Sequence, residues 1–179
     1  MTMLEYIKEQ PEVLDCAIQN RKELTRHFYE RFAEERPDHI YMIASGTSCN
    51  AARAAAPFVE KLLEIEVTVF PPSRAEKIWG KNPMVLLIAQ EGRSTNILKA
   101  AENLKEYRCV GLTGDLTGIL HKKCGTYVEI PCGEEHVGPK TKGYTATILI
   151  LYLMALEAGR AEEIISEQMY LEYLDAKEL

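Results

Sequence analysis

Two short glycine-containing segments have residue types that bind anions. The first, SGTS, occupies residues 45–48, and the second, QEGRST, occupies residues 90–95. Each follows a short apolar run and precedes a stretch with helical spacing, so each is expected to open a helix. The first N–H groups of a helix have no partner within it, and the helix dipole adds partial positive charge there. Since glycine also permits close approach of the backbone, the pattern predicts two loops that can hold a phosphate group.

Side chains in both loops could add to such a site. The hydroxyls of Ser48, Ser94 and Thr95 can donate hydrogen bonds to phosphate oxygens, and Arg93 can add charge. The alternative is that these are ordinary turn and capping residues, with Ser48 or Asn50 as the cap of the first helix. Either loop alone favours this alternative, whereas the two loops together favour phosphate binding.

Short apolar runs alternate with helical patterns along the chain. Strands are predicted at residues 39–46, 66–70, 84–90, 108–114 and 126–132. Helices are predicted at residues 3–10, 12–35, 47–64, 95–107, 144–159 and 161–177, with a helical turn at 73–79 and a loop or short helix at 114–123. Pro11 is expected to end the first helix, Pro57 could kink the third, and Gly159 is expected to close the apolar one.

This alternation predicts a single α/β domain over residues 1–179. Strands separated by helices pair in parallel through right-handed crossovers, which place helices on both faces of the sheet. We therefore expect a three-layer sandwich around a five-stranded parallel sheet, with the flavodoxin-like strand order 2-1-3-4-5. Residues 1–36 would be a helical lead-in, residues 40–159 the α/β core, and residues 161–177 a C-terminal helix.

The predicted strand order places the two glycine-containing loops together. In an open parallel sheet, ligands bind beyond the carboxyl ends of the strands, at the point where the strand order reverses. For the order 2-1-3-4-5 this point lies between the first and third strands. These are the strands that end in residues 45–48 and 90–95, whereas the second strand ends in Phe-Pro-Pro.

Composition excludes several other classes. A net charge of −6 with scattered basic residues argues against a nucleic-acid binder. No apolar run approaches the roughly 20 residues that span a bilayer, and the first residues lack an apolar signal core, so a cytoplasmic protein is expected. The five cysteines and four histidines lack disulfide-framework or zinc-site spacing, and no metal or cofactor is predicted. The nucleotide motifs GxxxxGK[ST] and GxGxxG are absent, as is the G-x-S-x-G elbow.

Three segments in this order resemble the SIS (sugar isomerase) domain: SGTS, AQEGRSTN and EEHVGPKTKGYTA. The likeness runs from about residue 40 to residue 159, and is greatest to the first SIS half of the glucosamine-6-phosphate synthase isomerase region and related phosphosugar isomerases or deglycases. It implies a sugar phosphate as ligand. The predicted phosphate-binding residues are Gly46, Thr47, Ser48, Gln90, Gly92, Arg93, Ser94 and Thr95.

Two positions depart from the pattern that the resemblance implies. Ala89 and Glu91 stand where the family has serines in its second loop, so two hydroxyls are lost and a carboxylate is gained. A carboxylate that points into a phosphate site would repel the ligand. Either Glu91 turns outward, or Arg93 offsets its charge, or the site no longer binds a phosphosugar.

The third segment supplies the candidate acid–base residues. The resemblance makes Glu135 the matching acid, with His136 as an alternative and Lys142 as a further site residue. A carboxylate near C1 and C2 of the sugar could shuttle a proton through an enediol, provided that burial raises its pKa towards neutrality. The alternative is a polar loop before a helix that starts at Thr141. Lys140 and Lys142 would then flank a helix N-terminus, which favours an anion nearby.

The resemblance also implies that this chain needs a second component for catalysis. Glucosamine-synthase-type proteins carry two SIS domains, and their acid–base residues come largely from the second half and from a partner subunit. This chain is either part of such a protein or a homodimer or higher homo-oligomer that uses residues 12–35 and 143–158 as subunit surfaces. Three functions remain open: a phosphosugar isomerase or deglycase, a non-catalytic phosphosugar-binding module, and an interaction protein that has lost the site.

Overall fold

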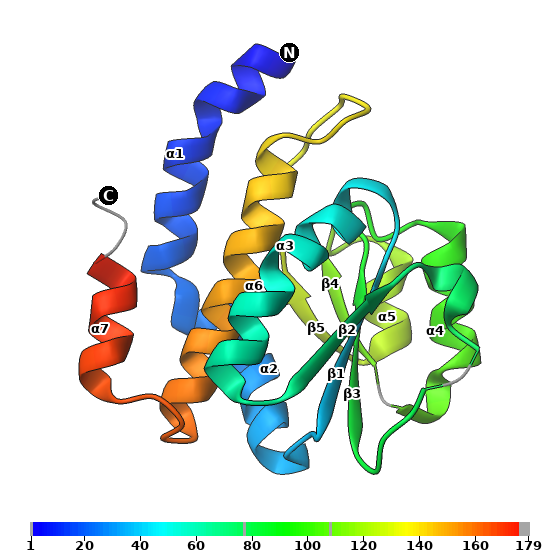
Figure 1. Ribbon diagram of the computed structural model, residues 1–179. Helices are drawn as coiled ribbons and strands as arrows, with labels where there is room; N and C mark the ends of the chain where they lie inside the picture. Colours follow the sequence, from blue (N-terminus) through cyan, green and yellow to red (C-terminus); the bar gives the residue numbers. More distant parts are fainter. Residues whose placement is uncertain (1, 77, 108, 176–179) are drawn as a thin grey trace.

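The computed structural model describes residues 2–76, 78–107 and 109–175, and it has three layers (Figure 1). The central sheet contains β1 (His39–Ala44), β2 (Glu66–Phe70), β3 (Pro83–Ile88), β4 (Val110–Thr113) and β5 (Thr126–Glu129). All neighbouring strands are parallel, in the order β2-β1-β3-β4-β5. The predicted α/β sandwich and the strand order 2-1-3-4-5 are therefore confirmed.

Helices cover both faces of the sheet. One face carries α1 (Met3–Gln19), α2 (Arg21–Glu35), α3 (Gly46–Leu63), α6 (Lys142–Ala161) and α7 (Glu167–Asp175). The other face carries α4 (Thr95–Asn103) and the short helix α5 (Ile119–Cys124), together with 3-10 turns at Pro72–Arg74 and Lys105–Tyr107. Within the described residues, no helix has the length and apolar character that a membrane crossing requires.

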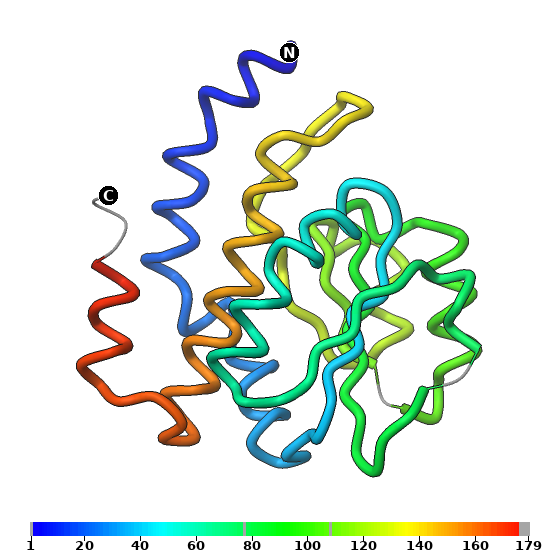
Figure 2. The backbone as a smooth tube through the Cα atoms, viewed as in Figure 1, coloured from blue at the N-terminus to red at the C-terminus, as the bar shows by residue number. Residues whose placement is uncertain are grey.

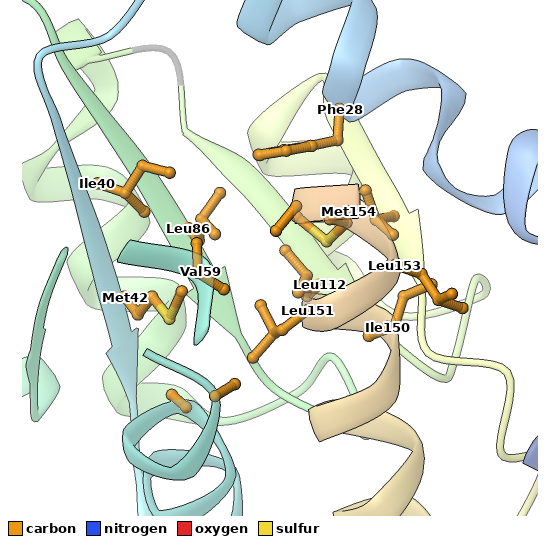
Figure 3. Close-up of a cluster of buried hydrophobic side chains, with 14 of the residues drawn as sticks. Phe28, Ile40, Met42, Val59, Leu86, Leu112, Ile150, Leu151, Leu153 and Met154 are labelled. Atoms are coloured by element: carbon orange, nitrogen blue, oxygen red, sulfur yellow. The ribbon is translucent and has the colours of Figure 1, made fainter. Parts of the chain in front are cut away.

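Alternating side chains of the central strands fill two separate cores. Ile40 and Met42 of β1 point to the side of α3 and α6, where they belong to one buried cluster with Val59 of α3 and Leu151 of α6 (Figure 3). Tyr41 and Ile43 point to the side of α4. Since successive residues of a strand face opposite sides of a sheet, the unbroken apolar run in β1 is what a doubly covered strand requires.

The prediction that Pro11 ends the first helix is wrong. Helix α1 continues through Pro11 and ends at Gln19, so the chain breaks at Asn20 instead. A proline inside a helix removes one backbone hydrogen bond, but tertiary packing can offset that loss. Here Tyr6 and Ala17, on either side of the proline, are both buried.

Two other predicted helix signals are also wrong. Helix α3 begins at Gly46 after Ser45, so neither Ser48 nor Asn50 is its cap, and it runs through Pro57 without a break. Helix α6 continues past Gly159 to Ala161, because its last turns pack against the end of α3 and the following loop. The chain then turns at Glu163, whose φ is +57°, and α7 starts at Glu167 rather than at residue 161.

Smaller differences concern element ends. The helix predicted at residues 95–107 ends at Asn103 and is followed by a 3-10 turn, and the turn predicted at 73–79 is limited to Pro72–Arg74. Several predicted strands include loop residues after the last ladder pair. The predictions that cover residues 77, 108, 176 and 177 lie outside the described residues.

The loop before α6, residues 130–141, projects from the end of the molecule where the N-terminus also lies (Figure 2). This is the end at which β1 and β3 finish. The fold therefore brings three loops to one end of the sheet: the loop after β1, the loop after β3, and the loop before α6.

Candidate functional site

An open cavity of about 300 Å³ lies where β1 and β3 end. The loop after β1, the loop after β3 and the loop before α6 all contribute to it. Its lining residues are Ser45, Thr47, Ser48, Ile88, Ala89, Gln90, Glu91, Arg93, Ser94, Ile97, Gly138 and Lys140. The two predicted loops thus lie on one cavity at the point where the strand order reverses, as the strand order required.

Both glycines of these loops have a left-handed backbone. Gly46 has φ of +54° and Gly92 has φ of +61°, a conformation that costs other residues free energy. At Gly92 a side chain would also clash, because an added Cβ would lie 2.8 Å from Oγ1 of Thr113. The glycines let the chain turn directly from a strand end into α3, and from the loop after β3 into the approach to α4.

The N-termini of α3 and α4 lack side-chain caps. Ser45 and Ser94 are the cap residues, and neither side chain accepts a hydrogen bond from the following helix. The first backbone N–H groups that donate to a carbonyl at these helix starts are those of Cys49, to Ser45, and of Leu98, to Ser94. The first N–H groups of both helices are therefore available to an anion, and the two helix dipoles add positive potential.

Besides the exposed Ser45, three residues with hydroxyl groups line the same cavity. Thr47, Ser48 and Ser94 are partly exposed. In the described parts of the chain, no hydrogen bond is made by any of these three side chains, and no buried side-chain oxygen or nitrogen lacks a partner. A ligand with several acceptor oxygens could engage them without breaking a bond within the protein.

Both cations of the cavity wall have acidic partners. Arg93 donates two hydrogen bonds to Oδ2 of Asp115, at 3.0 and 3.2 Å. Hydrogen bonds from Thr117, and then from Arg93, hold the pKa of Asp115 below its usual range. Lys140 pairs with Glu91, with 2.9 Å between Nζ and Oε1.

The position of Glu91 resolves the question raised by its sequence. Its side chain is 71% exposed, so it turns outward at the rim. The cation that offsets its charge is Lys140 of the third loop, and Arg93 is engaged by Asp115 instead. The prediction of an outward Glu91 therefore agrees with the structure, whereas the suggested Arg93 offset does not.

Glu135 lies behind the cavity and caps α6. One carboxylate oxygen accepts hydrogen bonds from the backbone N–H and the hydroxyl of Thr141, both at 2.6 Å. The other accepts from the N–H of Gly143 at 3.0 Å. Glu135 is 5% exposed, and it is absent from the cavity lining.

The environment of Glu135 keeps it ionised. Burial alone would raise its pKa, but hydrogen bonds from Thr141, Gly143 and Gln90 outweigh that effect, and the net pKa is lower than usual. A proton shuttle in an isomerisation needs the opposite shift, towards neutrality. The hydrogen bonds around the Glu135 carboxylate are therefore those of a helix cap, and they do not shift its pKa in the direction that a proton shuttle needs.

His136 and Lys142 have other partners than the cavity residues. The imidazole of His136 is 77% exposed and lies 3.1 Å from a carboxylate oxygen of Glu134, while its backbone N–H donates to the hydroxyl of Tyr6. Lys142 is buried and pairs with Glu9 of α1 at 2.6 Å. Neither residue lies on the cavity wall formed by the glycine-containing loops.

Gln90 connects the cavity to the capped helix. Its side chain lines the cavity, donates to Sγ of Cys132 at 3.3 Å, and packs on Gly143. A Cβ at Gly143 would lie 2.1 Å from Nε2 of Gln90, so a larger residue there would require the Gln90 amide to move. Burial raises the pKa of the Cys132 thiol to about 11, which keeps it protonated.

Some of the predicted phosphate-binding residues lie together at the cavity. Thr47, Ser48, Gln90, Arg93 and Ser94 line the cavity, and the two glycines shape its loops. Thr95, by contrast, is exposed outside the lining.

The sequence analysis did not assign Ser45, Gly138 and Lys140 to the site, although all three line the cavity. The signal that could have identified Lys140 was its proximity to a helix N-terminus, which was interpreted only as support for an anion. In the described residues, no cluster of three His, Cys, Asp or Glu side chains could hold a metal ion.

The family model named SIS domain matches residues 34–157, which is more than half of the chain. The chain therefore belongs to the SIS domain family. Among curated relatives, it is 29% identical over 169 residues to the isomerizing glutamine–fructose-6-phosphate aminotransferase of Oceanobacillus iheyensis. That alignment covers 89% of this chain and 28% of the relative, so the chain spans less than a third of the relative's length.

Solved structures share the fold. A protein of Clostridium difficile, provisionally described as a phosphosugar isomerase, superposes with a TM-score of 0.89 at 26% identity, covering 98% of this chain and 51% of that one. The C-terminal domain of glucosamine-fructose-6-phosphate aminotransferase from Francisella tularensis superposes with a TM-score of 0.85 at 20% identity, covering 97% and 52%. The latter likeness shows the fold alone. In both comparisons this chain corresponds to about half of its neighbour.

Proposed function

We propose that this SIS domain binds a sugar phosphate and serves in its aldose–ketose isomerisation or deglycation, with acid–base groups supplied from outside the chain. One observation carries the proposal. Two uncapped helix N-termini and three hydroxyls without protein partners converge on one cavity at the end of β1 and β3. A phosphate group, with its charge and several acceptor oxygens, matches that set of donors.

The comparisons support a phosphosugar as the ligand class. The relatives above are named as aminotransferases that isomerise a fructose phosphate or as phosphosugar isomerases. The cavity volume suits a small ligand at the lower end of the usual range for binding pockets. The phosphate would lie at the helix ends and beside Lys140, and the sugar would extend towards Gly138.

The proton transfer is the part that the chain does not complete by itself. In an enediol mechanism, a base removes a proton from the carbon next to the carbonyl and returns it to the neighbouring carbon. Glu135 is engaged by Thr141 and Gly143, and His136 faces solvent beside Glu134. We therefore propose that the base belongs to a second SIS domain or to another copy of the chain.

The second candidate function is a phosphosugar-binding module without chemistry, either regulatory or as one half of a two-domain enzyme. The engagement of Glu135 as a helix cap favours it, because among the described residues no buried carboxylate lies on the cavity wall. Incubation of the purified chain with fructose 6-phosphate, followed by chromatography of the sugars, tests whether copies of the chain complete the site for one another. Turnover supports an enzyme whose base comes from another copy, and binding without turnover supports the module or an enzyme whose base belongs to a second SIS domain.

Binding itself is tested by thermal unfolding in the presence of hexose, pentose and heptose phosphates. A ligand at 100 times its dissociation constant stabilises a protein by about 2.7 kcal/mol, which raises the midpoint by roughly 5 °C or more. The double variant with Ser48→Ala and Ser94→Ala should lose that rise. Ser73→Ala, at an exposed serine outside the cavity, is the matched control and should keep it.

Two outcomes would contradict the proposal. One is the absence of a midpoint shift with every phosphosugar, together with a shift for a ligand of another class. The other is a shift of equal size in the double variant, because the ligand would then bind elsewhere.

A further inference from the structure

Glu91 and Lys140 join two walls of the cavity. Glu91 belongs to the loop after β3, and Lys140 belongs to the loop before α6. Their side chains form an ion pair with 2.9 Å between Nζ and Oε1. Both residues line the cavity, so an anion bound there could contact the ammonium of Lys140 as well.

The two partners differ in how firmly they are held. Lys140 is 15% exposed, and its ammonium also donates to the backbone carbonyl of Glu135 at 2.5 Å. That carbonyl anchors the ammonium at the cavity wall independently of Glu91. Glu91 is 71% exposed, so its side chain can move into solvent at little cost. The carboxylate is therefore the mobile partner, and the ammonium is the fixed one.

The ammonium has a limited number of donors. A lysine ammonium has three N–H donors, and one of them is engaged by the Glu135 carbonyl. The carboxylate of Glu91 lies beside the same ammonium as an ion pair. An anion in the cavity must therefore either approach the ammonium beside a like charge or displace the carboxylate. Like charges at short distance repel, so displacement is the favoured route.

We propose that Glu91 determines the affinity of the cavity by competing with the ligand for Lys140. This inference rests on the proposed function and adds to it a specific residue and a charge preference. The competitor is part of the protein, so a ligand must bring enough negative charge to replace it. Doubly charged phosphate esters meet that condition, whereas neutral sugars gain nothing from the exchange.

The direct test compares the wild-type chain with Glu91→Gln by titration calorimetry, with fructose 6-phosphate and inorganic phosphate as probes. Removal of the competing carboxylate should tighten binding by about threefold, the size that a surface ion pair carries. Glu106→Gln removes the same charge at an exposed position outside the cavity, and it should leave the dissociation constant unchanged. Fructose without a phosphate should show no gain.

A double-variant cycle tests whether Glu91 acts through Lys140. Lys140→Met should weaken phosphate binding by about tenfold, as expected for a lost charge-assisted hydrogen bond. In that background, Glu91→Gln should no longer tighten binding. Circular dichroism checks that both variants are folded, and the exposed position of Glu91 makes its single variant interpretable by itself.

The outcomes distinguish this inference from the function on which it rests. If the wild type binds the sugar phosphate and Glu91→Gln binds it no more tightly, Glu91 is not a competitor and the phosphosugar function stands. If Glu91→Gln tightens binding equally with and without Lys140, the effect is a general one of charge and the inference is overturned. If neither the wild type nor Glu91→Gln binds, the proposed function fails as well.

Discussion

The helix N-termini at this end of the sheet are satisfied in two different ways. The first turn of α6 has its own anion, because the carboxylate of Glu135 accepts hydrogen bonds from Thr141 and Gly143. The first turns of α3 and α4 have no such group, since the cap residues Ser45 and Ser94 make no side-chain cap bond. The same physical requirement, a negative partner at a helix N-terminus, is met internally in one region and left open in the other.

This difference indicates which polar residues are structural and which are available to a ligand. Around α6, Lys142 pairs with Glu9, and Tyr6 accepts a hydrogen bond from the backbone of His136. These groups have partners within the chain, so their conformation needs no ligand. Thr47 and Ser48, by contrast, line the cavity, and their hydroxyls have no hydrogen-bond partners among the described residues. The open region is the better candidate for binding.

The largest expected effect is on the internally capped helix. Glu135→Ala removes three hydrogen bonds to a buried carboxylate and leaves two backbone N–H groups without that acceptor, so it should lower the free energy of unfolding by about 3 kcal/mol. Urea denaturation measures this loss. Glu134→Ala, at a neighbouring carboxylate that is 88% exposed, should change stability by less than about 0.5 kcal/mol. Equal stability of the two variants would show that Glu135 is not a structural cap.

A smaller effect is expected where the two regions touch. Gly143→Ala places a methyl group where the amide of Gln90 now lies, so Gln90 must leave its position against α6. The amide is the flexible end of its side chain and can rotate away, so the expected cost is about 1 kcal/mol, that of the lost hydrogen bond to Cys132. The move would also disturb the cavity that Gln90 lines. Gly138→Ala is the control for stability, because an added Cβ there meets nothing within 4 Å. If Gly143→Ala unfolds at the wild-type urea concentration, the close packing of Gln90 on α6 is not present in solution.

The smallest effect is on the pH dependence of stability. The folded-state pKa of Glu135 lies below its unfolded value of 4.5, because hydrogen bonds from Thr141 and Gly143 outweigh the effect of burial. Its stabilising contribution is therefore present above pH 4.5 and is lost as the pH falls through the lower folded-state pKa.

Urea denaturation of the wild type and of Glu135→Gln, at pH 6 and at pH 3.5, measures that contribution. The stability difference between the two proteins should shrink at the lower pH. Asp38 and Asp115, whose pKa values are also lowered, contribute equally to both proteins and cancel. A difference that grows at low pH would mean that the folded state holds Glu135 in its protonated form.

The structural features that could be predicted from the sequence were those that depend on residues close together in the chain. The apolar runs of β1 and β3 and the glycines at positions 46 and 92 identified the sheet and the two loops, because side-chain periodicity and positive φ are local properties. Proline and glycine were poorer guides to helix ends. Helices α1 and α6 run through Pro11 and Gly159, because packing against neighbouring helices outweighs a local preference.

From the residue types and their order alone, it follows that a parallel α/β sheet brings the two glycine-containing loops to its reversal point. That result follows from periodicity and from the rules of strand connection, which depend on neighbouring residues and chain handedness. Only the tertiary structure decided which charged groups already have partners. Glu9 and Glu91 meet Lys142 and Lys140 across large separations in the chain, and Glu135 folds back onto the start of α6. Such pairings depend on the relative positions of whole elements, so only folding distinguishes Glu135, held at a helix end, from the open hydroxyls of Ser48 and Ser94.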